Sequence, residues 1–272
     1  MVQPAEGRAP TYIDTTRASI ARVYDYALGG KDNYEVDRAI IDRIRAVAPE
    51  IGRIALDNRA FLIRAARFVA TQTPVTQFLD CGSGLPTAEN THQVVQRLRP
   101  EARVVYVDND PTVVAHGRAL LEDNDNTRFL DADLRDPGAV LDDPTVQEFL
   151  DLDRPVALFQ VATLHHVAER TAEIMAGYLD RLPAGSVVVL SHFFDPENDD
   201  SALARRIEDL LVHSPMGSGH FRTRPQIEAL FSGVELVEPG IVTCHRWWPD
   251  GPQLTPEDAV QRCVVGGVGI KP

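Results

Sequence analysis

The chain has 272 residues, 44% of them hydrophobic, and its formal net charge is −13 because 40 acidic residues outnumber 27 basic ones. This length fits one large α/β domain or two small ones, and it is ample for a continuous core. The acidic balance would repel a nucleic acid, and the arginines are scattered rather than clustered in a basic stripe. We therefore expect no nucleic-acid partner.

The cysteines and the apolar runs limit the compartment. Cys81, Cys244 and Cys263 form no CxxC pair, which argues against a disulfide framework and a structural zinc site. No apolar run approaches the roughly 18 residues of a membrane span, and residues 1–19 contain no apolar core of signal-peptide length. We expect a soluble, cytoplasmic protein with no metal site and no membrane partner.

Residues 1–13 contain two prolines and no periodicity, so a loose tail is expected there. Apolar periodicity then predicts helices over residues 15–28, 33–48 and 53–71. Gly29-Gly30 ends the first of them, because glycine adopts the left-handed cap conformation without steric cost. Asp32, with Glu35 three residues later, has the spacing of a capping box and predicts the start of the second helix.

After Pro74, short apolar runs alternate with amphipathic segments. Strands are predicted over residues 75–80, 102–108, 127–133, 154–162 and 186–193. Helices are predicted over residues 86–99, 112–123, 138–151 and 167–182. This alternation is typical of an open, mostly parallel sheet with helices on both faces.

The alternation of predicted strands and helices becomes less regular after Pro196. Beyond it the sequence predicts a helix over 201–213, a strand over 233–241, an irregular loop over 244–258 and a terminal strand over 261–270. The sequence contains no internal repeat and no low-complexity linker, so we predict one domain over residues 1–272 with an N-terminal helical cap.

The segment FLDCGSGLPT (78–87) follows the first predicted strand. Its GxG pair, Gly82 and Gly84, lets backbone amides approach a ligand at a helix N-terminus. The dinucleotide fingerprint requires a third glycine, but Thr87 stands in its place. Asp80 would oppose a pyrophosphate and fits a ligand with a cationic amino group better. The alternative is a plain strand-to-helix turn.

Two further acids end the next strands. Asp108 lies 24 residues after Gly84, where a carboxylate in a βαβ unit can accept hydrogen bonds from both hydroxyls of a ribose. Its alternative is an ordinary turn aspartate. Asp133 follows the third strand, where it could accept from the exocyclic amine of adenine. Asp131 and Asp136 flank it, and the choice among the three stays open.

The series DCGSG (80–84), VVYVDND (104–110) and DADLRD (131–136) resembles the motifs of class I S-adenosylmethionine-dependent methyltransferases. Other segments are similar to an actinobacterial family of S-adenosylmethionine-dependent methyltransferases long catalogued as a domain of unknown function. They are RVYDYALGGKDNYEVDR (22–38), FQVATLHHV (159–167), HFRTRPQIEALFSGVELVEPGIV (220–242) and GGVGIK (266–271). The resemblance covers nearly the whole chain. Gln160 and His166 depart from it, because apolar residues are expected at both positions.

The resemblance implies a Rossmann-like seven-stranded sheet whose last strand runs antiparallel, and S-adenosyl-L-methionine as the cofactor. We expect an N-terminal cap over 14–73, a cofactor-binding core over 74–195 and a substrate-side region over 196–272. The expected cofactor contacts in the core are Asp80, Gly82, Gly84, Asp108, Asn109, Asp133, Leu134 and Val161.

The GGKDN turn is a candidate lid. It precedes the first strand, so it can fold over the strand ends where ligands bind in open sheets. Gly30 would permit a close backbone approach, and Lys31 and Asn33 could reach the methionine carboxylate of the cofactor. The alternative is a well-capped helix–turn–helix with an exposed Lys31.

His165 and His166 follow the fourth strand, at the edge that faces the crevice. Either could act as a general base toward an acceptor. The alternatives are a structural His165 and a solvent-facing His166, and positioning alone could suffice for displacement at a sulfonium. Four aromatic residues are candidates for an acceptor pocket or for the core: Tyr24, Tyr26, Trp247 and Trp248.

Three function classes follow from these patterns. The first is a methyltransferase acting on a small molecule that enters between the N-terminal lid and residues 196–258. The second is a non-catalytic sensor or scaffold that binds the same cofactor through the same motifs. The third, an NAD-dependent oxidoreductase, is disfavoured by Thr87 at the third glycine position.

Overall fold

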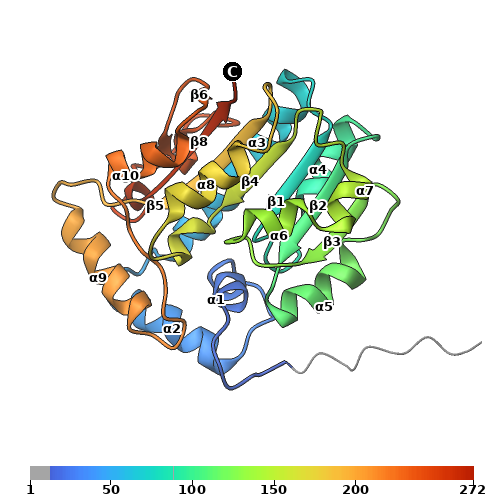
Figure 1. The fold of residues 1–272 in the computed structure, drawn as a ribbon. Coiled ribbons are helices and arrows are strands. Elements are labelled where there is room, and N and C mark those ends of the chain that lie inside the picture. Colours follow the sequence, from blue (N-terminus) through green and yellow to red (C-terminus); the bar gives the residue numbers. More distant parts are fainter. Residues whose placement is uncertain (1–12, 88) are drawn as a thin grey trace, which may run out of the picture.

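The computed structural model describes residues 13–87 and 89–272, so residues 1–12 of the predicted tail lie outside the described part. An eight-stranded sheet runs through the molecule in the order β3-β2-β1-β4-β5-β8-β6, and β7 pairs with β8 off this path (Figure 1). The strands are β1 (Gln77–Cys81), β2 (Arg103–Asp108), β3 (Thr127–Asp131), β4 (Ala157–Val161), β5 (Val187–Phe193), β6 (Glu235–Leu236), β7 (Val242–Thr243) and β8 (Val264–Ile270).

The predicted α/β fold is confirmed, with one difference in strand number. Strands β1 to β5 pair in parallel, and β8 is antiparallel to β5, as the resemblance implied. The eighth strand arises because the predicted strand over 233–241 is mostly irregular. Only Glu235–Leu236 pairs there, between Gly233 and Gly240, which both have positive φ angles, and the short β7 follows.

The helices cover both faces of the sheet and its carboxyl edge. They are α1 (Ile20–Ala27), α2 (Glu35–Arg45), α3 (Gly52–Gln72), α4 (Thr91–Leu98), α5 (Pro111–Leu120), α6 (Pro137–Leu141), α7 (Pro144–Phe149), α8 (Thr171–Leu179), α9 (Ser201–Val212) and α10 (Arg224–Glu228). Four short 3₁₀ turns join them: η1 (Leu164–His166), η2 (Ala229–Phe231), η3 (Cys244–Arg246) and η4 (Gln261–Cys263).

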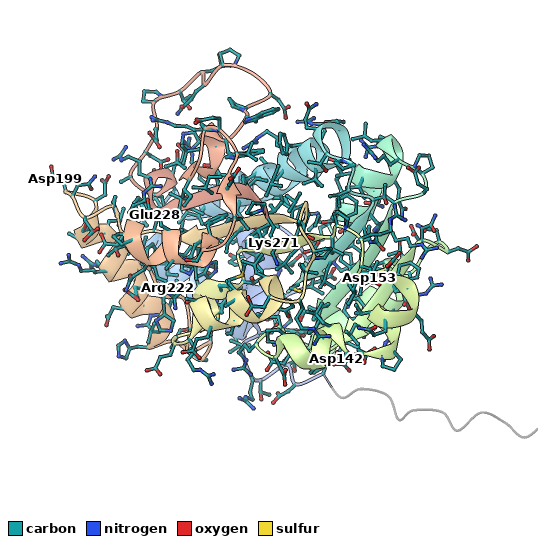
Figure 2. The ribbon with its side chains drawn as sticks, turned by 45° about the horizontal axis from the view of Figure 1, so that its top comes forward. Asp142, Asp153, Asp199, Arg222, Glu228 and Lys271 are labelled. Atoms are coloured by element: carbon teal, nitrogen blue, oxygen red, sulfur yellow. The ribbon has the colours of Figure 1, made fainter. Side chains whose placement is uncertain are left out.

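Successive residues of the central strands belong to different cores. Phe78 packs with residues of α3 and α4 on one face of the sheet, whereas Leu79 packs with residues of α6 and α8 on the other. This alternation follows from the period of two in a β-strand. Because both faces are buried, the strands are apolar almost throughout. Acidic side chains such as Asp142, Asp153 and Asp199 lie at the periphery (Figure 2).

Three predicted helix boundaries are wrong for local reasons. Helix α2 begins after Tyr34 rather than Asp32, because the Asp37 carboxylate accepts from the Tyr34 amide at 2.9 Å. Helix α4 begins at Thr91, capped by Asn90 and Gln93. The predicted helix over 138–151 is two helices, α6 and α7, because Pro144 cannot continue a helix and instead begins a new one.

A buried polar cluster, which we call the α1 latch, ties α1 to α2 and α5. Arg22 Nε donates to Asp37 Oδ2 at 2.8 Å, and the Ser19 amide donates to Asp37 Oδ1 at 3.0 Å. Arg22 Nη1 donates to Thr112 at 3.2 Å, and the Ser19 hydroxyl donates to Asp110, the N-cap of α5. The latch holds α1 beside the strand ends, where Figure 1 shows it.

No helix within residues 13–87 and 89–272 is both long enough and apolar enough to cross a membrane.

Candidate active site

A cavity of about 350 Å³ lies at the carboxyl ends of β1, β2 and β4. Its floor is the loop of Gly82, Ser83 and Gly84, and helices α1 and α3 form its other side. Open α/β sheets bind ligands at this edge, and the volume falls in the range of small-molecule sites.

Two glycines shape the floor of this cavity. Gly82 has a φ of +72°, and a Cβ atom there would lie 2.4 Å from Thr163 Cγ2. The amides of Gly82 and Ser83 both donate to the carbonyl of Val107, at 2.7 and 3.2 Å. Gly84 has a φ of +67° and no atom near its Cβ position. The GxG pair therefore brings the backbone to the cavity without a side chain above it.

The two predicted acids of the first strands both line the cavity. Asp80 is buried and accepts from the Thr91 hydroxyl at 2.6 Å. Asp108 accepts from the amides of Gly84 at 2.9 Å and Asp110 at 3.0 Å. Burial raises the pKa of each carboxyl to about 6, although these hydrogen bonds act in the opposite direction. Both carboxylates are therefore suited to a ligand whose positive charge or hydrogen-bond donors replace the water lost on burial.

The other predicted core contacts divide into two groups. Asn109, Leu134 and Val161 line the cavity. Asp133 is not among the lining residues, because its carboxylate is held by Arg135, whose Nε lies 2.9 Å away. This hydrogen bond lowers the pKa of Asp133.

The structure does not bring the GGKDN turn to the cavity. Asp25 holds this turn instead: the Gly30 amide donates to its carbonyl at 2.8 Å, and Asn33 Nδ2 donates to its Oδ2 at 2.8 Å. A Cβ atom on Gly30 would overlap the Asp25 carboxylate, which accounts for the second glycine. Lys31 is exposed. This arrangement favours the capped helix–turn–helix alternative.

Residues of α1 and α3 line the cavity in place of that turn. They include Ser19, Ile20, Tyr24, Asn58 and Arg59. The Tyr24 hydroxyl donates to the Ala55 carbonyl at 3.1 Å and accepts from Asn58 Nδ2 at 2.8 Å, and burial raises its pKa to about 12. Sequence reasoning missed Asn58 and Arg59, because polar residues at helical spacing carry no motif that separates them from a solvated face.

The two candidate bases occupy different positions. His166 lines the cavity at the glycine loop, and its Nδ1 lies 2.9 Å from the Ser218 hydroxyl. His165 is buried beneath it and stacks on Phe193, with ring centroids 3.6 Å apart. Burial lowers the pKa of His166 to about 3 and holds that of His165 well below its usual range. Both rings are therefore neutral near pH 7 and are weak bases.

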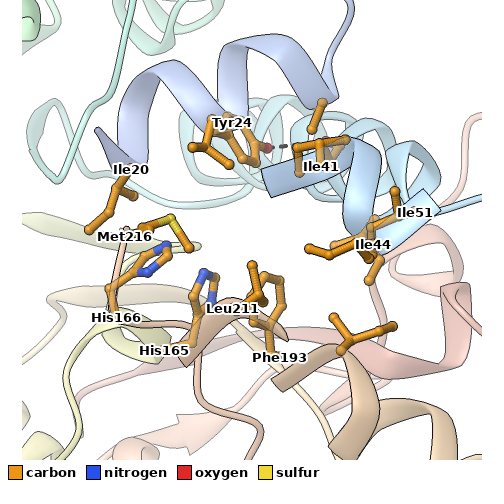
Figure 3. Close-up of a pocket in the computed structure, with 15 residues that line it drawn as sticks. Ile20, Tyr24, Ile41, Ile44, Ile51, His165, His166, Phe193, Leu211 and Met216 are labelled. Atoms are coloured by element: carbon orange, nitrogen blue, oxygen red, sulfur yellow. Dashed lines mark hydrogen bonds between the residues drawn. The ribbon is translucent and has the colours of Figure 1, made fainter. Parts of the chain in front are cut away.

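A second, apolar cavity of about 60 Å³ lies next to the first (Figure 3). It lies between α1 and α2 on one side and η1, β5 and α9 on the other. Four residues line both cavities and form a shared wall: Ile20, Tyr24, His166 and Met216. His165 lines the apolar cavity but not the larger one.

Of the four candidate pocket aromatics, Tyr24 lines the cavities and the other three pack elsewhere. Trp247 is fully buried against Phe61 and Phe68, and Trp248 stacks on Trp247. Tyr26 accepts a hydrogen bond from Arg45 at 3.0 Å. Within the described residues, no group of His, Cys, Asp and Glu side chains could hold a metal ion.

Comparisons with known proteins agree with this geometry. A family model described as S-adenosyl methyltransferase matches residues 6–272. A solved structure from Thermobifida fusca YX, described as a candidate methyltransferase, is 39% identical, with a TM-score of 0.89 over 94% of this chain and 96% of that one. A DUF574 family protein from Streptomyces avermitilis is 36% identical, with a TM-score of 0.90 over 96% and 100%. No curated protein matches the chain. The chain therefore belongs to the S-adenosyl methyltransferase family and is an S-adenosylmethionine-dependent methyltransferase.

Proposed function

We propose that the protein methylates a small molecule, which reaches the methyl group from the apolar cavity. The observation that carries this proposal is the shared wall: the cavity at the glycine loop and the apolar cavity meet at Ile20, Tyr24, His166 and Met216. The apolar cavity lies between residues of the N-terminal cap and residues of the 196–272 region, such as Leu211. A cavity of about 60 Å³ accommodates a small group rather than a macromolecular surface.

The residues of the larger cavity fit S-adenosylmethionine, which supplies the methyl group from its sulfonium. Asp108 would accept from the ribose hydroxyls, and Asp80 would face the cationic amino group. Arg59 lines the same cavity and would bind the methionine carboxylate, the role first considered for Lys31. The Ser83 hydroxyl is buried without a hydrogen-bond partner among the described residues, as expected for a group that a ligand satisfies.

Leu134, Val161 and Asn109 complete the proposed cofactor set, because they line the same cavity. Gly30, Lys31, Asn33 and Asp133 are not included, because they lie outside it.

We do not assign a strong general base to this site. A base is most effective when its pKa lies near the working pH, and the pKa of His166, lowered to about 3, lies far below it. The neutral imidazole instead keeps the neighbourhood of the sulfonium free of a second positive charge. Catalysis then depends mainly on holding the acceptor in line with the methyl group.

Asp108→Asn tests the cofactor set, with Asp133→Asn as the matched control. Charge-assisted hydrogen bonds contribute about 1.5–3 kcal/mol each, so we expect Asp108→Asn to weaken S-adenosylhomocysteine binding at least tenfold by calorimetry. Asp133→Asn should leave the affinity unchanged. The wild-type protein should bind S-adenosylmethionine and not NAD. Equal losses in both variants, or a larger loss in Asp133→Asn, would contradict the proposed set.

A further inference from the structure

We propose that the apolar cavity recognises an uncharged, ring-sized group that carries one hydroxyl, as in a phenol, and that this hydroxyl is the methyl acceptor. The inference rests on the proposed function and adds to it the chemical class of the acceptor. It follows from the composition of the cavity wall, its size and one unpartnered polar atom.

The wall of the cavity excludes charged acceptors. Its lining comes mainly from aliphatic side chains of α1, α2, α3 and α9, including Val23, Ile44, Ile54 and Ile207, together with Phe193. Among the described residues that line it, none carries a full charge. A protonated amine or a carboxylate would lose its hydration there without an opposite charge nearby, which is costly. The group that enters must therefore be neutral.

The size of the cavity limits the group that enters it. It measures about 60 Å³ and is not fully enclosed. This is less than half of the roughly 150 Å³ of an apolar cavity that binds benzene, so it receives one edge of a single ring and nothing larger. One wall is aromatic: His165 stacks on Phe193 at 3.6 Å and 9°, and Phe193 stacks on Phe221 at 4.9 Å.

One fully buried polar atom in this wall makes no hydrogen bond within the part of the chain that the structure describes. His165 Nδ1 is buried and makes no hydrogen bond to the described residues, and the ring projects from η1 toward the cavity beside His166 and Phe193 (Figure 3). Buried polar atoms are nearly always satisfied in proteins, so this nitrogen is a candidate partner for a ligand atom. A hydroxyl supplies both a donor and acceptor lone pairs. It therefore fits either tautomer of His165.

The transfer step balances with a hydroxyl acceptor. The acceptor oxygen forms a bond to the methyl carbon as the carbon–sulfur bond breaks, and sulfur keeps that electron pair. The oxygen becomes cationic as the new bond forms, so its proton becomes strongly acidic. The neutral imidazole of His166, in the shared wall, accepts that proton and passes it to solvent. A weak base is sufficient for this transfer.

Binding of simple probes to the protein saturated with S-adenosylhomocysteine tests the proposal without turnover. We expect phenol to bind at least tenfold more tightly than benzylamine or benzoate, measured by calorimetry or ligand-observed NMR. Toluene lacks the hydroxyl and should bind roughly two- to tenfold more weakly than phenol. Equal binding of the charged probes would overturn the proposal.

Variants locate the binding site. Ala27→Leu fills space in the apolar cavity from a half-buried position that does not line the cofactor cavity. It should weaken phenol binding at least tenfold and leave S-adenosylhomocysteine binding unchanged. His165→Phe keeps a ring against Phe193 and should abolish the preference for phenol over toluene. An unchanged phenol affinity in Ala27→Leu would refute the site.

With S-adenosylmethionine, the expected product is the methyl aryl ether, identified by mass spectrometry. The two proposals fail in different ways. If S-adenosylhomocysteine itself does not bind to the larger cavity, the proposed function fails. If it binds normally but phenol has no advantage over the charged probes, only the acceptor class fails.

Discussion

The two cavities share a wall but are built by different rules. The proposed cofactor cavity lies on a sheet edge, with strand-end acids such as Asp80 and Asp108 and a glycine loop between them. The apolar cavity lies between helices, and its residues come from four helices, a strand, a 3₁₀ turn and the segments that hold Ile51 and Met216. The first therefore depends on a few positions that are set by backbone geometry and charge. The second depends on the summed shape of many side chains, any of which can be exchanged for a similar one.

A variant of the α1 latch should have the largest effect and should disturb both cavities together, because α1 borders both of them. Asp37→Asn leaves Arg22 buried without its opposite charge, so we expect the free energy of unfolding to fall by about 3–5 kcal/mol in urea titrations. Binding of S-adenosylhomocysteine and of phenol should weaken together. Asp42→Asn, which removes the exposed pair with Arg45, is the control and should cost about 0–1 kcal/mol. A loss confined to one ligand would mean that α1 supports one cavity only.

Gly82→Ala should impair ligand binding to one cavity and leave the other cavity unchanged. Its Cβ would meet Thr163 Cγ2 at 2.4 Å at a φ of +72°, so the glycine loop must shift. We expect at least a hundredfold loss of S-adenosylhomocysteine affinity with the apolar cavity intact. Gly217→Ala is the control, because Gly217 has a similar φ of +70° but no atom within 4 Å of its Cβ position. If both variants lose affinity equally, backbone strain rather than the clash is responsible.

The pH dependence of binding should also differ between the cavities. Asp80 and Asp108 have their pKa values raised to about 6, so both take up protons in the free protein below pH 6 and lose the charge that the proposed cofactor contacts require. Affinity for S-adenosylhomocysteine should be constant above about pH 7 and fall below pH 6 by up to about tenfold per pH unit for each acid.

Phenol binding should not change between pH 5 and pH 8, because the pKa of His166 is lowered to about 3 and burial holds the pKa of His165 well below its usual value. Asp108→Asn should halve the slope of the cofactor titration. A slope that is unchanged in this variant would assign the protons to other groups.

The smallest expected effect comes from a single methylene in the apolar wall. Ile44→Val should cost about 0.5–1.5 kcal/mol of stability and shift the preference from phenol toward a methyl-substituted phenol, with cofactor affinity unchanged. Ile40→Val is the control: Ile40 is buried on the same helix but does not line the cavity. A selectivity change in the control would point to a general movement of α2 rather than to cavity shape.

Sequence patterns predicted the sheet and its edge well. The central strands are buried on both faces, so their apolar runs are easily recognised. Asp80 and Asp108 lie at the carboxyl ends of β1 and β2, and Gly82 and Gly84 follow β1. Each of these positions is fixed by backbone geometry at a strand end. Such geometry leaves a local signature that one sequence is enough to show.

The helical side of the site could not be predicted in the same way. Arg59 and Ser19 line the cavity because of how α1 and α3 pack over the strand ends, which depends on contacts between distant segments. The GGKDN turn misled for a related reason: its second glycine accommodates the Asp25 carboxylate, a contact within the turn itself. A glycine pair in the sequence does not show whether the glycine makes room for a nearby side chain or for a ligand.

The shared wall constrains how this enzyme can diverge. A substitution at Ile20 or Met216 changes the lining of the proposed cofactor cavity as well as that of the proposed acceptor cavity. Ile41, Ile207 and Leu211 border the apolar cavity alone, so they are free to vary without affecting the methyl donor. Among relatives with different acceptors, variation should concentrate on these outer positions. Natural selection can thus change the substrate of the fold while its donor site stays constant.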